Sequence, residues 1–164
     1  MRVLFQTKNC EACELMPCVR SILITHPLTG KRATRFISFP YLQLALIGAQ
    51  GQYRSVAAGM SKLPWTNDNS VSFPLPLPNS YENFHVCGIT ANSLEELCKV
   101  FWNSRFQGNG YPGCLGLEKS SMKNLNIWQK MTLMAPEFIL SEGCNYGTKP
   151  LVFKKTIEGL AKQF

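Results

Sequence analysis

Alternating apolar and polar side chains dominate the first half of the chain and predict β-strands there. Tyr41 to Ile47 places three leucines on one face, and Ala33 to Phe39 alternates in the same way. Val19 to Thr25 is rich in β-branched residues, and Gln52 to Ala58 follows a turn that contains glycine. Because the connections between these runs are too short for helical crossovers, we expect an antiparallel meander of three or four strands.

Residues 61–83 have no regular pattern, whereas the residues after them have helical periodicity. Alternate prolines from Pro74 to Pro78 favour extended backbone and exclude a central strand. Ser93 followed three residues later by Glu96 is typical of a capped helix start, and apolar residues at helical spacing continue to Phe106. Two further helices are predicted, over Ser121 to Met134 and over Lys155 to Phe164.

Composition and element order together indicate one domain of the α+β class. The chain has 164 residues, of which 45% are hydrophobic and 16% charged, so it is globular rather than disordered. Ten prolines and twelve glycines imply many turns and argue against an all-helical bundle. We therefore expect a single domain over residues 1–164, with the meander sheet first and the helices after it. Residues 1–18 are its cysteine-rich amino-terminal segment.

The charge balance is basic, with 17 Lys and Arg against 10 Asp and Glu and a net charge of +7. The basic residues are scattered, which favours a solvated surface; weak attraction to nucleic acid or to an acidic partner is the alternative. The longest apolar run, Phe36 to Ala49, is broken by Pro40 and Gln43 and is too short for a membrane helix. The amino terminus lacks a long apolar signal stretch, so we expect a cytoplasmic protein with no membrane association.

The strip that ends at Cys87 carries the most informative chemistry. Pro78 and Asn79 close a short apolar run, and Cys87 follows the asparagine by eight residues. A proline-fixed turn can hold a side-chain amide near a thiol, which suits a thiol that carries an acyl group while the amide stabilises the oxyanion. His85 would lie on the same side of an extended segment, where it could lower the thiol pKa or act as a base. The alternative is a Cys87 that is simply a small buried hydrophobic residue.

Cys10, Cys13 and Cys18 form a second candidate site. Two cysteines separated by two residues can share one zinc ion on a tight turn, and a third thiol nearby strengthens this interpretation. A fourth ligand would come from elsewhere in the chain, and no second pair of this spacing exists. Unligated thiols are the alternative, whereas the surrounding pattern does not support a redox pair. No cofactor is required by the sequence, and zinc is the one candidate.

The order of these elements resembles the ubiquitin-conjugating-enzyme fold, in which a meander sheet precedes a proline-rich stretch, a His-Pro-Asn tripeptide and a catalytic cysteine. Here the tripeptide reads Leu77-Pro78-Asn79, and its spacing to Cys87 matches that of the family. The amino-acid sequence is most similar to the prokaryotic ubiquitin-conjugating-like proteins of family D, typified by protein B of the PRTRC plasmid and phage systems. The resemblance covers roughly residues 36–107 and is carried by Ser38-Phe39-Pro40-Tyr41, Pro76-Leu77-Pro78-Asn79, Val86-Cys87-Gly88 and Phe101-Trp102-Asn103-Ser104-Arg105-Phe106.

The resemblance implies a reaction as well as a fold. It implies that Cys87 accepts an acyl group from a ThiF-like activating partner and passes it to an amine, with Asn79 as the oxyanion donor. The implied protein partner is this ThiF-like protein or a ubiquitin-like protein. Three departures from the family's pattern bear on this reaction. Leu77 replaces the tripeptide histidine, and Gly88 instead of leucine follows the cysteine. A third is the stretch Glu82-Asn83-Phe84-His85, which replaces the glycine usual between the asparagine and the cysteine.

Three functions are therefore compatible with the sequence. The first is a ubiquitin-conjugating-like protein of a bacterial, plasmid or phage system that acts as an acyl-thioester carrier through Cys87. The second is a non-catalytic scaffold or assembly subunit on the same fold, for example of a phage or plasmid complex. The third is a small basic zinc-knuckle protein that binds nucleic acid through its net charge and the Cys10/Cys13/Cys18 cluster.

Overall fold

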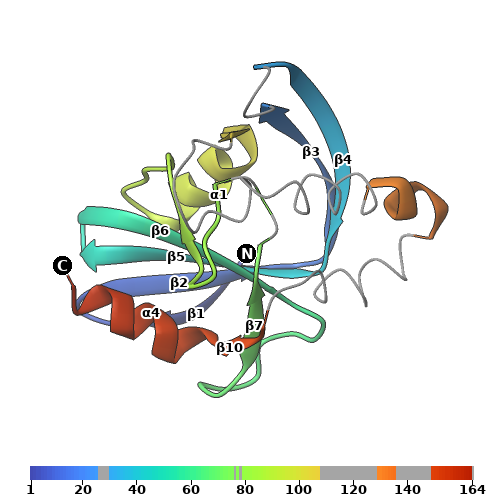
Figure 1. Cartoon of the computed structure of the whole chain (residues 1–164). Helices are drawn as coiled ribbons and strands as arrows, with labels where there is room; N and C mark the ends of the chain where they lie inside the picture. The colour runs from blue at the N-terminus through green and yellow to red at the C-terminus, as the bar shows by residue number, and fades with distance from the viewer. Residues whose placement is uncertain (26–29, 76, 78, 108–128, 136–148, 164) are drawn as a thin grey trace.

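The computed structural model combines mainly antiparallel sheets with helices (Figure 1), which confirms the predicted α+β class. Among the residues described, no helix has the length and apolar content that a bilayer crossing requires. The described residues are 1–25, 30–75, 77, 79–107, 129–135 and 149–163.

Strands from both ends of the chain form the larger sheet, which has seven strands. They are β1 (Arg2–Gln6), β2 (Cys10–Leu15), β5 (Tyr41–Ala49), β6 (Gln52–Ser61), β7 (Val71–Pro74), β8 (His85–Val86) and β10 (Leu151–Val152). The order along the sheet is β1-β2-β5-β6-β7-β10, and β8 also pairs with β6. All of these pairs are antiparallel.

A second sheet has three strands, in the order β4-β3-β9. It contains β3 (Cys18–Thr25), β4 (Arg32–Phe39) and β9 (Arg105–Gln107). The β3–β4 hairpin is antiparallel, whereas β9 runs parallel to β3 after the chain has passed through a helix. The two sheets therefore divide the strands that the sequence pattern assigns to one meander.

The departure from the predicted meander occurs at Pro40. β5, β6 and β7 follow one another as a meander requires, but β4 lies in the second sheet and β5 pairs with β2 instead. Proline has no backbone N–H and cannot continue a strand ladder, so the chain changes sheets at this residue. The β3–β4 hairpin is consequently inserted between two strands that pair with each other along the whole of β2. The expectation that residues 61–83 contain no strand is wrong, because β7 lies there between β6 and β10 and ends at Pro74.

Two helices have bounds close to those predicted. α1 (Leu94–Asn103) begins after Ser93, whose hydroxyl accepts a hydrogen bond from the Glu96 N–H at 3.2 Å, so the predicted N-cap is confirmed. The helix ends at Asn103, before the predicted Phe106, because β9 begins at Arg105 and pairs with β3. α4 (Phe153–Ala161) starts two residues before the predicted Lys155. Residues 129–134 are helical, and the remainder of the predicted helix over 121–134 lies outside the described residues.

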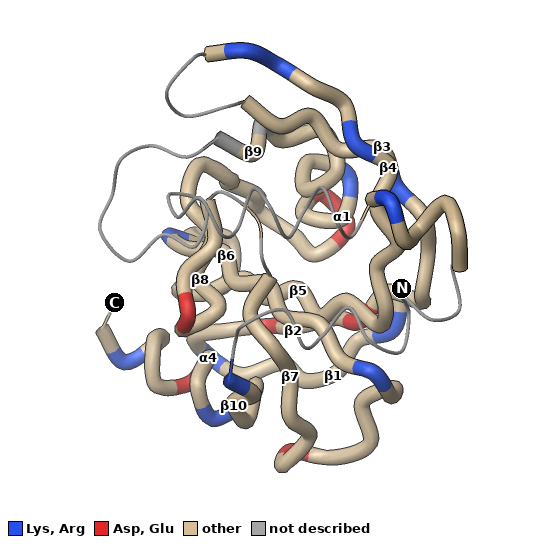
Figure 2. The backbone as a smooth tube through the Cα atoms, turned by 45° about the vertical axis from the view of Figure 1, so that its right-hand side comes forward, with Lys and Arg blue, Asp and Glu red and all other residues tan. Residues whose placement is uncertain are grey.

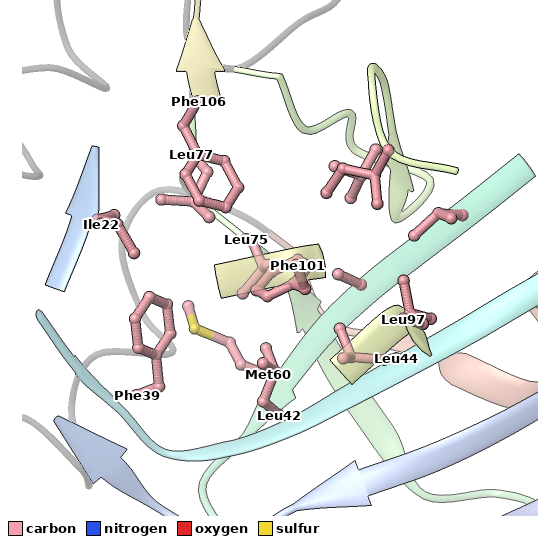
Figure 3. Close-up of a cluster of buried hydrophobic side chains, with 14 of the residues drawn as sticks. Ile22, Phe39, Leu42, Leu44, Met60, Leu75, Leu77, Leu97, Phe101 and Phe106 are labelled. Atoms are coloured by element: carbon pink, nitrogen blue, oxygen red, sulfur yellow. The ribbon is translucent and has the colours of Figure 1, made fainter. Parts of the chain in front are cut away.

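α1 and α4 cover opposite faces of the larger sheet. Successive side chains of a strand point to opposite faces, so each helix packs against a different set of sheet residues. Leu97 and Phe101 of α1 pack in one buried cluster with Leu42 and Leu44 of β5 (Figure 3). On the other face, α4 contributes its buried side chains to a second cluster built on the small and apolar residues of β2, β5 and β6. The buried members of that cluster are Cys10, Ala12, Ala45, Ile47, Ala57, Trp65, Phe84, Phe153, Ile157 and Ala161.

Candidate thiol site at Cys87

Cys87 follows β8, in the segment that leads from the larger sheet to α1. β8 is held against β6 through His85 and Val86, and the Phe84 carbonyl accepts a hydrogen bond from the Ala58 N–H at 2.9 Å. The backbone immediately before the thiol is therefore part of the sheet. Cys87 itself is partly exposed, and its thiol is free of any disulfide.

Asn79 and Cys87 lie side by side. The Cys87 N–H donates to the Asn79 carbonyl at 2.9 Å, and the Asn79 side-chain amide donates from Nδ2 to the Cys87 carbonyl at 2.6 Å. The amide group of Asn79 thus completes a reciprocal pair across the base of the loop that carries residues 80–86. The asparagine is only 4% exposed, so this contact is shielded from water.

The direction of the Asn79 amide differs from the arrangement expected for an oxyanion donor. Its described contact is with the Cys87 carbonyl, not with the thiol, and its Oδ1 atom is buried without a hydrogen-bond partner among the described residues. The amide therefore holds the backbone on which the thiol is mounted. In this state the donor of the Asn79 amide is engaged by the Cys87 backbone.

Tyr81 supplies the polar contact of the thiol, a role that the sequence pattern did not indicate. The Cys87 Sγ atom lies 3.6 Å from the Tyr81 hydroxyl oxygen and donates to it. The Tyr81 ring stacks on the His85 ring, with centroids 5.4 Å apart and planes 18° from parallel. The Tyr81 N–H also donates to the His85 carbonyl at 2.9 Å. The described contact of His85 with the site therefore runs through Tyr81.

A strained turn produces this stack. Phe84 has a φ of +72°, a left-handed conformation that costs a non-glycine residue about 1–2 kcal/mol. Its ring is fully buried and packs edge-on against the ring of Phe153 in α4, with the two ring centroids 5.1 Å apart. This packing offsets the strain. The Phe84 N–H donates to the Tyr81 carbonyl at 3.1 Å and closes the turn. The buried phenylalanine thus brings Tyr81 back over His85.

The other predicted site residues are not brought together. Cys10 and Cys13 both lie on β2, where residues three apart point to opposite faces of a sheet. Cys10 belongs to the cluster under α4 and Cys13 to the cluster under α1, while Cys18 is partly exposed at the start of β3. A tight turn would have directed Cys10 and Cys13 to one ion, and β2 is a strand instead. Within the described part of the chain, no group of three His, Cys, Asp or Glu residues is placed to hold a metal.

Comparison of the chain with protein-family models, with curated proteins and with solved structures found no match. The resemblance to ubiquitin-conjugating proteins therefore rests on the sequence features given above. The chemistry of the site is accordingly inferred from its own contacts: a partly exposed thiol, a phenol beside it, and a buried amide that holds the thiol's backbone.

His85 makes the stability of this site dependent on pH. Burial lowers the pKa of its imidazole, whereas in the unfolded chain a histidine titrates near 6.5. The unfolded state therefore binds more protons below this pH, so the contribution of neutral His85 is complete above about pH 6.5 and is lost as the pH falls through the lower folded-state value. We expect His85→Phe, which keeps an aromatic ring on Tyr81, to lose less stability than wild type between about pH 7.5 and pH 5.

Urea unfolding midpoints across this pH range test the expectation. His26→Asn, a change of the other of the chain's two histidines, is measured in parallel. Parallel pH profiles for wild type and His85→Phe would show that His85 is not the titrating group.

Proposed function

We propose that this chain is a ubiquitin-conjugating-like protein that carries an acyl group as a thioester on Cys87. The single observation that carries the proposal is the reciprocal pairing of Asn79 and Cys87 at the base of the loop. This pairing holds a partly exposed thiol in a defined place between the sheet and α1, as a repeated nucleophile requires. A ThiF-like activating protein and a ubiquitin-like protein are the partners that the sequence resemblance implies, in a bacterial, plasmid or phage system.

The chemistry uses the contacts of the thiol. The Cys87 sulfur attacks the carbonyl carbon of an acyl thioester, the thiol of the donor leaves with the proton that Cys87 gives up, and the acyl group stays on Sγ. Tyr81 is within reach of this proton, because its hydroxyl lies at the sulfur. The thiol's residue is partly exposed, and the next residue, Gly88, is exposed as well. An amine that later attacks the acyl carbon releases the Cys87 thiolate.

A second candidate function is a non-catalytic scaffold or assembly subunit on the same fold. The observation that favours it is the engagement of the Asn79 amide, which is bonded to the Cys87 carbonyl and nearly inaccessible to solvent. An amide in this position stabilises an oxyanion only after it leaves its carbonyl partner. The same contact is sufficient to explain Asn79 as a structural residue of a protein that binds partners without chemistry.

The zinc-knuckle interpretation receives less support from the contacts. The two cysteines of closest spacing face different cores, as described above. Figure 2 shows Lys and Arg spread over the β3–β4 hairpin, the amino-terminal region and α4, and not gathered on one element. A dispersed positive charge of this kind favours solvation over a nucleic-acid footprint.

Acyl transfer from a synthetic donor tests the proposal without the natural partners. The purified full chain is mixed with a short peptide that carries a carboxy-terminal thioester of a small thiol, and the acylated residue is identified by mass spectrometry. We expect a hydroxylamine-sensitive adduct on Cys87, formed at least about tenfold faster than on Cys18, the partly exposed thiol of β3. Cys87→Ser is expected to abolish the labile adduct, and the matched Cys18→Ser variant is expected to retain it.

The scaffold function makes the opposite prediction for the same experiment. If the peptide adds to Cys18 or to Cys98 as fast as to Cys87, or to none of the three, then Cys87 is not an acyl carrier. Folding of each variant is verified by its urea midpoint, so that a loss of labelling is not mistaken for a loss of structure.

A further inference from the structure

Cys13 and Cys98 form a pair of thiols that the sequence does not bring together. They lie on β2 and α1, and their Sγ atoms are 3.8 Å apart although the residues are separated by 85 positions. The other cysteines for which contacts are described have different surroundings. Cys10 contacts the Thr7 hydroxyl at 3.1 Å on the opposite face of the sheet, and Cys87 contacts Tyr81.

The two sulfurs differ in their access to solvent. Cys13 is fully buried in the core under α1. Cys98 is partly exposed and lines an open cavity of about 510 Å³ whose wall also includes Met1, Cys18 and Trp102. The Met1 sulfur lies 3.4 Å from the Cys98 sulfur. A small solute that enters the cavity therefore meets Cys98, with Cys13 directly behind it.

The two thiols also differ in acidity. The hydrogen bond from Cys13 lowers the pKa of Cys98, and the positive amino terminus at Met1 adds to this effect against the opposing influence of burial. The same hydrogen bond, together with burial, raises the pKa of Cys13. Of the two sulfurs, the one that faces the cavity is therefore the more readily deprotonated.

We propose that Cys98 is a hydroperoxide-reactive thiol and that Cys13 is its resolving partner, so that oxidation links α1 to β2 through a disulfide. The Cys98 thiolate attacks the nearer peroxide oxygen, the O–O bond breaks, and the departing alkoxide or hydroxide takes up a proton. The Cys13 sulfur then attacks the sulfur of the resulting sulfenic acid, and water leaves with the Cys13 proton. In sum, two thiols are oxidised and one hydroperoxide is reduced to an alcohol, or to water, with one further water formed.

The geometry needs little adjustment for this bond. A disulfide has an S–S length of about 2.05 Å. From their separation of 3.8 Å the sulfurs must therefore approach by somewhat under 2 Å before the bond can form. The pair lies on the face of the sheet under α1 and involves neither Cys87 nor its contacts. The inference is therefore independent of the proposed acyl transfer and can fail or succeed separately.

Oxidation of the reduced full chain with stoichiometric hydrogen peroxide tests the proposal. We expect the chain to lose two hydrogens and to retain two fewer alkylatable thiols, with peptide mapping that joins Cys13 to Cys98. Cys13→Ala is expected to prevent the cross-link and to leave a sulfenic acid on Cys98 that dimedone traps. The oxidised wild type is expected to unfold at a higher urea concentration than the reduced form, because the cross-link restricts the unfolded chain.

Three matched variants keep the test specific. Cys10→Ser removes a thiol from the same strand but from the opposite face, Cys18→Ser removes the other thiol of the cavity, and Cys87→Ser removes the candidate acyl carrier. Each is expected to form the Cys13–Cys98 bond at the wild-type rate. A cross-link between Cys18 and Cys98, a disulfide between two chains, or no faster oxidation of Cys98 than of Cys10 would overturn the proposal. Because Cys98→Ser changes a partly exposed residue, it tests the loss of the bond if Cys13→Ala does not fold.

Discussion

Replacement of Gln43 by methionine is expected to destabilise the protein by about 3 kcal/mol, since three buried hydrogen bonds of about 1 kcal/mol each are lost. Gln43 is fully buried on β5. Its Nε2 atom donates to the Glu14 carboxylate at 3.0 Å and to the Ser61 hydroxyl at 2.8 Å, and its Oε1 atom accepts from the Ser72 hydroxyl at 3.0 Å. Methionine has a similar shape, so the loss reports the polar contacts and not a cavity.

One of the three partners of Gln43 is the buried Glu14 carboxylate, which has further contacts. The carboxylate is 3% exposed and is also held by the Arg2 guanidinium at 2.6 Å and by the Trp65 N–H at 2.8 Å. Without Gln43, one buried carboxylate oxygen keeps only the Trp65 contact among its described partners. A partly satisfied buried charge is costly, because water cannot replace the missing donor.

Urea unfolding midpoints at neutral pH measure the effect. Gln52→Met is the matched control, since Gln52 is exposed at the start of β6, and its replacement is expected to change the unfolding free energy by no more than about 0.5 kcal/mol. A cost below about 1 kcal/mol for Gln43→Met would mean that the network contributes little net stability.

The same network explains why the sequence pattern did not predict β2. Its six residues, Cys-Glu-Ala-Cys-Glu-Leu, contain two glutamates and no β-branched residue, and such a segment resembles a loop or a metal knuckle. Tertiary contacts override this weak propensity, because Arg2 and Gln43 satisfy the Glu14 carboxylate inside the sheet. The strands predicted over Tyr41 to Ile47 and over Gln52 to Ala58 correspond to β5 and β6. The first was predictable because its leucines alternate along the strand, and the second because a turn that contains glycine precedes it.

Only the contacts between residues close in sequence could be predicted for the candidate site. The spacing of Asn79 and Cys87 indicates a shared turn, and the structure places the two residues together. The contact of Tyr81 with the thiol depends on the positive φ of Phe84. Glycine or asparagine at this position would have indicated such a conformation, and phenylalanine does not. The Cys13–Cys98 pair depends on the docking of α1 on β2, a contact between segments 85 residues apart. The sequence analysis linked Cys13 to Cys10 because it assumed a tight turn. Both residues lie on the strand β2 instead, and their side chains point to opposite faces of the sheet.

Replacement of Asn79 by alanine is expected to lower the unfolding free energy by about 2 kcal/mol and to slow acylation of Cys87 at least about tenfold. The truncation leaves the Cys87 carbonyl without its 2.6 Å donor in a shielded position. The backbone that presents the thiol then loses the contact that fixes it, so the productive orientation becomes less populated. Both effects have one cause, and they are measured together by urea unfolding and by transfer from the peptide thioester.

Asn79→Asp separates the donor from the shape of the side chain. The ionised aspartate matches asparagine in size but cannot donate to the Cys87 carbonyl and places negative charge against it. We expect it to be at least as destabilising as alanine, whereas the matched change Asn83→Asp, at an exposed position in the same loop, is expected to leave the unfolding midpoint nearly unchanged. Acylation at the wild-type rate in a folded Asn79→Ala protein would show that Asn79 does not position the thiol. If acylation instead falls about a hundredfold or more while the unfolding midpoint stays at the wild-type value, then Asn79 contributes to the transition state itself, as an oxyanion donor that leaves the Cys87 carbonyl during the reaction.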